Sequence, residues 1–299
     1  MKRVLITGAN SYIGTSFEKY ASDNYGAEFS VVTIDMTSGS WKEKDFSGYD
    51  ICLHVAGIAH ADIGKADDAT KAKYYAVNRD LAVETAKKCK ASGISQFVFM
   101  SSAIIYGDSA PYGKTKRISK DTIPQPANFY GDSKWQADKA VRELSDDNFI
   151  VTVLRPPMIY GKGSRGNYPV LSKMAVRLPF FPNVENERSM LYIENLCEFL
   201  CQVMIRGEGG VFWPQNKQYS RTSEVVRLIA KAHDRKILIT GLINFGVIIA
   251  SHIPGKISGL ANKAFGNLSY EADMSEYDFE YRVADLEESI LRTEKGSDS

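Results

Sequence analysis

The first part of the chain alternates between short apolar runs and longer segments whose apolar residues recur every three or four positions. The apolar runs are Arg3–Thr7, Phe29–Ile34, Ile51–Val55, Gln96–Met100 and Phe149–Leu154. Runs of this kind predict strands of a parallel sheet, because helices cover both faces of such a sheet. The helical patterns between them are Ile13–Asn24, Thr70–Ala91 and Gly131–Leu144. This order predicts an α/β protein with a Rossmann-type, doubly wound parallel sheet.

The alternation becomes irregular after Pro156. Residues 161–167 have the composition of a loop, and helical patterns follow at Tyr168–Arg177, Ile193–Arg206 and Leu286–Arg292. We expect residues 1–160 to form the Rossmann domain, with some later segments returning to it. Residues 161–299 are expected to form mainly a smaller, substrate-binding lobe over the carboxyl edge of the sheet, where ligands of such folds bind.

One later stretch, Ile237–Ile253, is strongly apolar. It is too short to span a bilayer, and Gly241, Asn244 and Gly246 interrupt it. We predict a core or cap helix here in preference to a membrane-surface contact, and no integral membrane segment.

The charge balance excludes some classes of partner. The 299 residues include 37 basic and 36 acidic side chains, for a net charge of +1. A nucleic-acid-binding protein would carry a basic excess, so we expect no nucleic-acid partner. Any anionic ligand must be bound by a local arrangement.

The cysteines indicate a reducing environment. Cys52, Cys89, Cys197 and Cys201 lie in apolar segments without a disulfide-like or C-x-x-C spacing, and no histidine lies near the last two in sequence. We expect buried thiols and no metal site. The chain enters its first strand within three residues, so we expect no signal peptide and a cytoplasmic location.

A phenol and an ammonium stand four residues apart at Tyr130 and Lys134. On a helix these positions share a face, so both groups can point at one ligand. A tyrosine with its ordinary pKa near 10 is a poor base at neutral pH, and a neighbouring cation lowers that value. The pair predicts proton transfer, although such a spacing also occurs by chance on a solvated helix.

A second motif points to a nucleotide. The first strand leads into Gly8-Ala9-Asn10-Ser11-Tyr12-Ile13-Gly14, in which Ser11 stands where a second glycine is usual. Such a turn lets the backbone and a helix N-terminus meet a pyrophosphate. Asp35 ends the next strand, where a carboxylate accepts hydrogen bonds from ribose hydroxyls and repels a 2′-phosphate. No basic residue follows within residues 36–38. These features predict NAD in preference to NADP.

Together these motifs resemble the extended short-chain dehydrogenase/reductases, in the group of NAD-dependent nucleotide-sugar epimerases and dehydratases. The matching pieces, over roughly residues 3–200, are residues 8–14, Asp35, residues 54–57, Asn78, residues 101–107, residues 130–134 and residues 155–161.

The resemblance implies roles for individual residues. Tyr130 exchanges a proton with a sugar hydroxyl or ketone, Lys134 holds the nicotinamide ribose and lowers the phenol's pKa, and Ser102 hydrogen-bonds the same sugar oxygen. The implied NAD-binding residues are Gly8, Asn10, Ser11, Tyr12, Ile13, Gly14, Asp35, Val55, Ala56, Gly57, Asn78, Ser101, Tyr130, Lys134 and Pro156. His54 is expected to be a structural strand-end histidine.

Within this family, Ala103 and Ile104 argue against a dehydratase. They occupy positions where dehydratases carry acidic residues, and elimination of water needs such an acid and base. The favoured reading is a 4-epimerase of a UDP-hexose or UDP-N-acetylhexosamine, in surface-polysaccharide sugar biosynthesis. The alternative is an NAD(H)-dependent reductase of 4-keto-6-deoxy nucleotide sugars. A non-catalytic NAD-binding sensor or scaffold is a third reading, against which the complete Ser102, Tyr130 and Lys134 set argues.

The resemblance also suggests a nucleotide-sugar site and a dimer. Asn167 and Arg188 match family positions that meet the nucleotide diphosphate, and an amide and a guanidinium suit phosphate oxygens. Met158 replaces the asparagine usual in the family, and the late arginine that commonly completes the diphosphate site is missing. A homodimer through the helices around Thr70–Ala91 and Gly131–Leu144 is expected.

Overall fold

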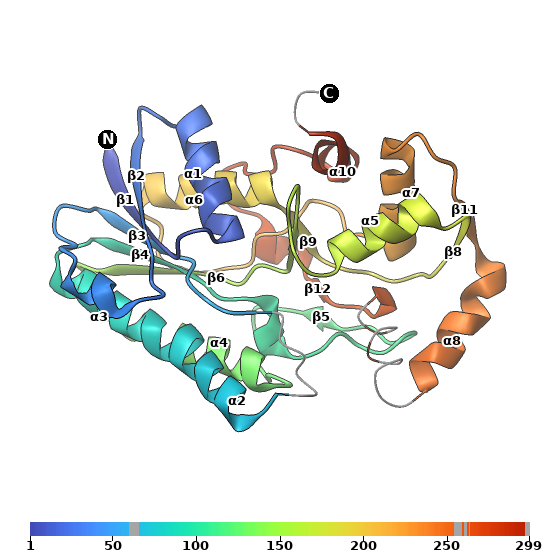
Figure 1. Cartoon of the computed structure of the whole chain (residues 1–299), viewed down its shortest axis with the longest axis horizontal. Coiled ribbons are helices and arrows are strands. Elements are labelled where there is room, and N and C mark those ends of the chain that lie inside the picture. Colours follow the sequence, from blue (N-terminus) through green and yellow to red (C-terminus); the bar gives the residue numbers. More distant parts are fainter. Residues whose placement is uncertain (60–65, 254–258, 260–261, 263, 297–299) are drawn as a thin grey trace.

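The structure is a computed structural model that describes residues 1–59, 66–253, 259, 262 and 264–296. Its centre is a six-stranded parallel sheet in the order β10-β6-β4-β3-β1-β2 (Figure 1). The strands are β1 (Lys2–Thr7), β2 (Phe29–Ile34), β3 (Ile51–His54), β4 (Gln96–Met100), β6 (Ile150–Leu154) and β10 (Gly210–Phe212). The predicted doubly wound Rossmann-type fold is confirmed.

Helices cover both faces of this sheet because alternate residues of each strand point to opposite sides. Val4 and Ile6 of β1 enter the core beneath α1 (Tyr12–Asn24) and α6 (Ile193–Arg206), whereas Leu5 enters the core beneath α3 (Leu81–Ala91) and α4 (Phe129–Arg142). Figure 1 shows these two helical layers on either side of the strands. Both cores are therefore apolar, as the continuous apolar runs predict.

The sheet changes winding direction at β1. This strand pairs with β2 on one side and with β3 on the other, and Thr7 is the register partner of His54. The loops that follow β1 and β3 consequently leave the sheet side by side. In doubly wound folds this switch point is where ligands bind.

The predicted helix Thr70–Ala91 is interrupted. It consists of α2 (Asp68–Tyr75), a π-helical turn (Ala76–Asp80) and α3. The turn carries the buried Asn78, whose amide nitrogen donates to the Ile58 carbonyl at 3.0 Å and whose amide oxygen accepts from the Ile58 nitrogen at 2.9 Å. A π-turn inserts a residue into a helix and often marks a functional site. The spacing of apolar residues alone does not reveal this π-helical turn, because the helices on either side of it each keep their apolar face.

The second half of the chain contributes to the sheet and also builds a separate group of elements. α6 packs on α1, and β10 forms the sheet edge. The helices α5 (Tyr168–Arg177), α7 (Thr222–Ala232) and α10 (Leu286–Lys295) pack together. Short parallel pairs accompany them, namely β7 (Met158–Tyr160) with β9 (Met190–Tyr192), β8 (Phe180–Pro182) with β11 (Leu238–Thr240), and β5 (Arg117–Ile118) with β12 (Ser269–Tyr270).

The apolar stretch Ile237–Ile253 is not a core helix. It forms β11, the 3-10 turn Gly241–Ile243 and α8 (Asn244–His252). Leu242 and Phe245 are 91% and 69% exposed. Of the predicted core or cap helix, the core alternative is therefore wrong, while a helix is present as the largely exposed α8. Among the residues that the structure describes, no helix has both the length and the apolar character needed to cross a bilayer.

The helices expected to form the dimer interface turn some of their apolar residues toward the sheet. Ala82 and Ala86 are buried against the sheet, so they cannot contact a second copy. Tyr75 and Ala140 remain partly exposed. The homodimer stays a prediction.

Candidate active site

The turn between β1 and α1 lies directly against the loop that follows β3. Gly8 has a φ of +113°, and a Cβ atom there would lie 2.8 Å from the Ala56 nitrogen. Only glycine therefore fits this position. Asn10 has a φ of 62°, a left-handed conformation that asparagine tolerates. The absence of a side chain at Gly8 lets the backbone approach a pyrophosphate.

The start of α1 is held at the same place. The Ser11 hydroxyl accepts a hydrogen bond from the Gly14 nitrogen at 3.2 Å and so caps the helix. A Cβ atom at Gly14 would lie 2.6 Å from that hydroxyl and 3.2 Å from Val55 Cγ2. Tyr12 and Ile13 form the first turn, whose amide groups and positive dipole end suit a pyrophosphate. The cradle fits a dinucleotide.

Asp35 follows β2 at this same edge of the sheet. The Gly8 nitrogen donates to the Ile34 carbonyl at 3.0 Å, which places Asp35 beside the turn. Its two carboxylate oxygens accept hydrogen bonds from the Thr37 nitrogen and the Thr37 hydroxyl, at 2.8 Å each. These bonds lower the pKa of Asp35. The exposed group is thus a carboxylate at neutral pH, as an acceptor of ribose hydroxyls must be.

The Lys134 ammonium lies at the ends of β3 and β4. It donates to the Met100 carbonyl at 3.0 Å. A Cβ atom at Gly57 would lie 3.3 Å from this ammonium and 3.2 Å from the Asn78 side-chain oxygen, so the three residues are in close contact. Burial lowers the pKa of Lys134 to about 8, although the Asp138 carboxylate opposes the shift. Among the described residues no carboxylate bonds to this buried cation, as is expected of a lysine that binds ribose hydroxyls.

His54 has a structural role here. Its Nδ1 atom lies 2.7 Å from the Thr7 hydroxyl, and its ring stacks near Phe97 and Phe99. Burial, together with the charge of Lys134, lowers the pKa of His54 to about 3. The imidazole is neutral at physiological pH, so it does not serve as an acid.

Tyr130 and Ser102 meet through their hydroxyl groups. Burial of the ring and the adjacent Tyr74 phenol raise the pKa of Tyr130 to about 12, while a hydrogen bond from Ser102 lowers it. The predicted lowering of this pKa by Lys134 is wrong for this structure. The ammonium is engaged by the Met100 carbonyl, and desolvation of the phenolate outweighs any stabilisation. Tyr130 consequently keeps its proton at neutral pH.

Two features at the start of α4 bring Tyr130 to Ser102. The Asn128 side chain accepts from the Gly131 nitrogen at 3.0 Å and caps the helix. A Cβ atom at Gly131 would lie 2.8 Å from the Ile104 carbonyl oxygen. Glycine is therefore what allows α4 to approach the segment after β4 so closely.

A buried ion pair holds the next turn of α4. Arg155 donates two hydrogen bonds of 2.9 Å to Asp138 and one of 2.8 Å to the Tyr106 hydroxyl. The Tyr106 hydroxyl also accepts from the Trp213 indole at 2.9 Å. Bidentate pairing fixes orientation as well as distance. Because Asp138 lies one turn after Lys134, the pair anchors the helix to the end of β6.

Ser101 and Pro156 follow the two strands β4 and β6 that flank this site. The Ser101 nitrogen donates to the Leu154 carbonyl at 2.8 Å, and the Ala103 nitrogen donates to the Pro156 carbonyl at 2.9 Å. The Ser101 hydroxyl is buried without a hydrogen-bond partner in the described part of the chain. A buried, unpaired hydroxyl at this edge suits a polar ligand.

The two predicted diphosphate residues lie in the second half of the chain, at the start of α5 and beside Ser220. Asn167 is exposed at the start of α5, where its side chain forms no cap. The Arg188 backbone pairs with Ser220 in both directions, and burial lowers the pKa of its guanidinium. Their role stays a prediction.

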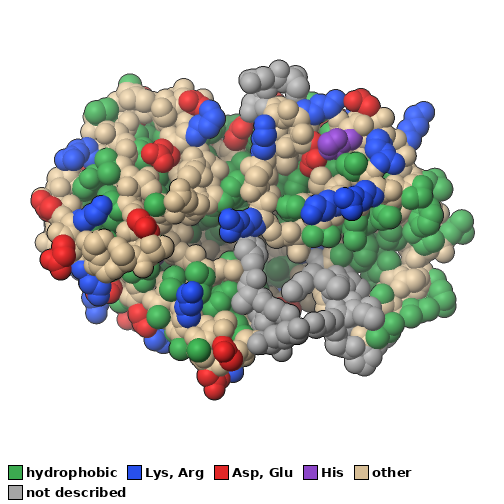
Figure 2. Space-filling view, in the orientation of Figure 1, with side chains coloured by type: hydrophobic (Ala, Val, Ile, Leu, Met, Phe, Trp, Pro, Cys, Tyr) green, Lys and Arg blue, Asp and Glu red, His purple; other side chains and the backbone are tan. Residues whose placement is uncertain are grey.

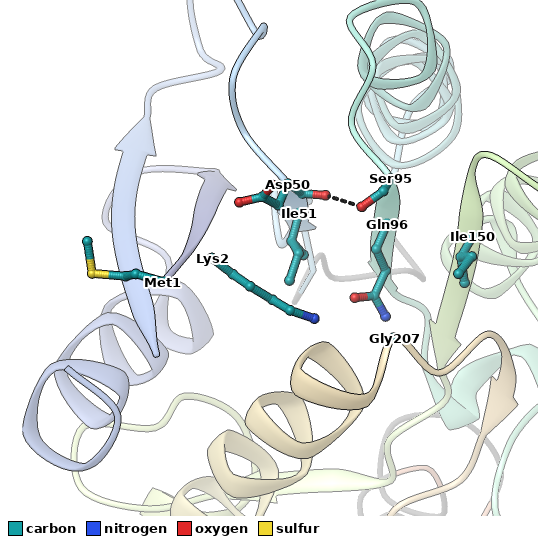
Figure 3. A pocket seen from close by; sticks show the side chains of 8 residues that line it. All are labelled: Met1, Lys2, Asp50, Ile51, Ser95, Gln96, Ile150 and Gly207. Carbon is teal, nitrogen blue, oxygen red and sulfur yellow. Dashed lines mark hydrogen bonds between the residues drawn. The ribbon is translucent and has the colours of Figure 1, made fainter. Parts of the chain in front are cut away.

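A cavity of about 250 Å³ opens at the other edge of the sheet. Figure 3 shows it between the first residues of the strands, with Lys2, Asp50 and Gln96 around it. Ligands of doubly wound folds bind at the carboxyl edge instead. This cavity therefore does not belong to the site around Tyr130.

Sequence reasoning missed Asn128, Gly131, Tyr74 and Asp138. An asparagine directly before a helical pattern is a capping signal, and that signal points to Asn128. Nothing in the local sequence indicates that Gly131 faces the Ile104 carbonyl, or that Asp138 meets Arg155, since these contacts join separate elements.

Comparison with known protein families identifies the family to which this chain belongs. The model of the NAD dependent epimerase/dehydratase family matches residues 4–212. The chain belongs to this family. It is accordingly an epimerase or oxidoreductase enzyme that uses NAD, and the turn, the carboxylate and the buried lysine described above are the residues that fit the cofactor.

Two individual relatives show which enzymes of the family this chain resembles. The chain is 27% identical over 257 residues to the UDP-glucose 4-epimerase of Vibrio cholerae, covering 78% of this chain and 76% of that protein. It is 26% identical over 218 residues to the N-acetyl-alpha-D-glucosaminyl-diphospho-ditrans,octacis-undecaprenol 4-epimerase of Escherichia coli O157:H7, covering 66% of this chain and 61% of that protein.

A solved structure shares the fold. The dTDP-4-dehydrorhamnose reductase of Bacillus anthracis, in complex with NADP, superposes with a TM-score of 0.71 over 98% of both chains. The two sequences are 17% identical. At that identity the likeness shows the fold alone.

Replacement of the buried lysine tests the electrostatics of the site. We expect Lys134→Met to raise the free energy of unfolding at pH 7 by about 2 kcal/mol. Removing the buried charge stabilises the protein by about 3 kcal/mol, and losing the hydrogen bond to Met100 costs about 1 kcal/mol. Between pH 8 and 10.5 the unfolded chain retains the lysine proton and the folded chain releases it. The free energy of unfolding of the wild type therefore rises over this pH range, and its difference from that of the variant becomes smaller.

Denaturant unfolding from pH 7 to pH 10.5 measures this difference. Lys139→Met is the control, because Lys139 is an exposed lysine of the same helix, and it should change stability little at any pH. A Lys134→Met protein that is less stable than wild type at pH 7 would contradict the prediction.

The close contact at Gly131 gives a second test. We expect Gly131→Ala to lower the free energy of unfolding by about 1–3 kcal/mol, because the new methyl group overlaps the Ile104 carbonyl. Gly246→Ala is the matched control, since Gly246 is also helical and has open space around it. That change should leave stability unchanged or raise it by up to about 1 kcal/mol. Equal effects of the two substitutions in denaturant unfolding would refute the assigned contact.

Proposed function

We propose that this enzyme is a 4-epimerase of a nucleotide-activated hexose or N-acetylhexosamine. The observation that carries the proposal is the geometry after β4, where Gly131 brings α4 against the Ile104 carbonyl, the Ser102 side chain lowers the pKa of the Tyr130 phenol, and the buried Lys134 bonds to the Met100 carbonyl. Ala103 and Ile104 follow Ser102 without a carboxyl group. The site thus has groups for proton exchange at one carbon and lacks, at these positions, those for elimination of water.

Each residue has a distinct task in this proposal. Tyr130 carries its proton at neutral pH and so donates it to a ketone oxygen during reduction. The Ser102 hydrogen bond stabilises the phenolate that oxidation requires. Lys134 binds the ribose hydroxyls of the cofactor, while Asp35 binds those at the adenosine end. When bound, NAD supplies the acceptor and donor of a hydride.

In this proposal Arg188 and Asn167 bind the substrate. A half-buried guanidinium meets phosphate oxygens strongly because little water screens it, and the free amide at the start of α5 adds a donor. The names of two relatives bear on the substrate: one acts on UDP-glucose and the other on a sugar joined through a diphosphate to undecaprenol. Both share a sugar diphosphate, which is the group that these two residues would bind.

The second candidate is a reductase of 4-keto-6-deoxy nucleotide sugars. The shared fold of dTDP-4-dehydrorhamnose reductase favours it, and the same Tyr130 proton would serve. Retention of the cofactor distinguishes these candidates, because an epimerase regenerates its cofactor in each turnover and a reductase must exchange it.

Release of bound dinucleotide tests the epimerase proposal. We expect purified protein, denatured and analysed by liquid chromatography, to release stoichiometric NAD and no NADP, because Asp35 repels a 2′-phosphate. The undenatured protein should interconvert UDP-glucose and UDP-galactose, or the N-acetyl pair, without added cofactor. An empty protein that consumes NADH with a 4-keto sugar would instead establish the reductase.

Loss of one hydroxyl tests the assigned proton donor. Tyr130→Phe should lower kcat roughly 10²–10⁴-fold, the usual contribution of a positioned proton-transfer group, and leave NAD content unchanged. Tyr75→Phe is the control, since that phenol donates to Asp132 on α4 at 2.7 Å and lies outside the site. Undiminished turnover by Tyr130→Phe would remove Tyr130 from the chemistry.

A further inference from the structure

An exposed apolar face covers one end of the second half of the chain. It is formed by α5, β8, β11 and α8, and Figure 2 shows hydrophobic side chains gathered there, at the right of the view. Its most exposed members include Met174, Phe180, Leu238, Leu242, Phe245 and Ile249, which are between 40% and 91% exposed. Contiguous apolar surface of this kind is uncommon on a monomer and marks an interaction site.

The face is built by the fold, since its elements pair with one another. Phe180 and Leu238 are register partners in the parallel pair of β8 and β11, and both point outward, at 50% and 65% exposed. The next residue of β8, Phe181, points inward and is 2% exposed. The Asn244 side chain at the start of α8 donates to the Asn183 carbonyl after β8 at 2.8 Å. The outward side chains therefore share one surface.

This face has an unusual charge. Residues 168–182 and 235–252, which include the four elements of the face, contain no aspartate or glutamate, although the chain has 36 acidic residues. Lys173, Arg177, Arg235 and Lys236 are all exposed, and none of them forms an ion pair within the part of the chain that the structure describes. The neighbouring acid Asp234 is paired with Lys295. The face is therefore apolar and basic together.

On α5 the two properties occupy the same side of the helix. Val170, Lys173, Met174 and Arg177 are exposed and follow the i, i+3, i+4, i+7 spacing of one face. A protein core would accommodate the apolar side chains of this face and exclude the basic side chains. The boundary between lipid headgroups and acyl chains accepts both, because apolar side chains enter the acyl region and basic groups meet lipid phosphates.

We propose that this face binds the surface of a membrane that contains anionic phospholipid. A second copy of the chain fits less well, because a two-fold interface would place the same basic side chains against one another. The inference does not depend on the proposed reaction. It gives the enzyme a peripheral position at a bilayer, with no membrane-spanning helix required.

Flotation with vesicles tests the proposal. The full-length protein should float with vesicles of phosphatidylcholine mixed with phosphatidylglycerol, and much less with phosphatidylcholine alone or at high salt. Lys173→Gln combined with Arg177→Gln should weaken partitioning roughly thirtyfold, from the usual contribution of two basic groups at an anionic surface.

Apolar positions provide the matched variants. Leu242→Asp with Phe245→Asp should reduce partitioning at least about tenfold. Both side chains are largely exposed, so unfolding midpoints should stay near wild type. Ile205→Asp is the control, since Ile205 is 38% exposed on α6, away from the face, and should bind vesicles as wild type does.

Two outcomes would overturn the inference. One is equal recovery with charged and uncharged vesicles, or no flotation at all. The other is a wild-type dimer in sedimentation analysis that Leu242→Asp with Phe245→Asp converts to monomer, which would assign the face to self-association. In each case the cofactor-release experiment remains a separate test of the proposed reaction.

Discussion

The close approach of α4 to the ends of β4 and β6 is the constraint on which the candidate site depends. At its first turn, Gly131 lies so near the Ile104 carbonyl that no side chain fits. One turn beyond Lys134, the bidentate pair of Asp138 and Arg155 fixes the helix to β6. Tyr130 lies directly before the first contact and Lys134 lies between the two, so the glycine packing and the buried ion pair fix the positions of both side chains.

The site also contains groups whose burial opposes stability. Lys134 is a buried ammonium with a lowered pKa, and Asn78 is a polar residue in a π-helical turn. The fold tolerates them because their hydrogen bonds are provided, by the Met100 carbonyl in one case and by Ile58 in the other. Such conflicts between local preference and final structure are expected where a protein binds or reacts with a ligand.

Prediction from the sequence succeeded where the physical signal was local or periodic. The strands of the sheet follow from their apolar runs, and the Gly8–Gly14 turn follows from its glycines and its place after β1. It failed at Ile237–Ile253, since an apolar composition indicates what a segment can bury against and not whether the fold supplies a covering element. The pKa of Tyr130 was also missed, because desolvation depends on residues such as Tyr74 that are distant in sequence.

The sequence by itself determined the fold class, the NAD-type turn with Asp35, and the presence of Ser102, Tyr130 and Lys134, because periodicity and short motifs are carried by neighbouring residues. Tertiary structure alone decided that Ser102 meets Tyr130, that Lys134 bonds to Met100 and that an apolar, basic face stays uncovered. These outcomes depend on contacts between elements far apart in the chain. Their energies come from burial and hydrogen-bond geometry, which exist only once the elements have packed.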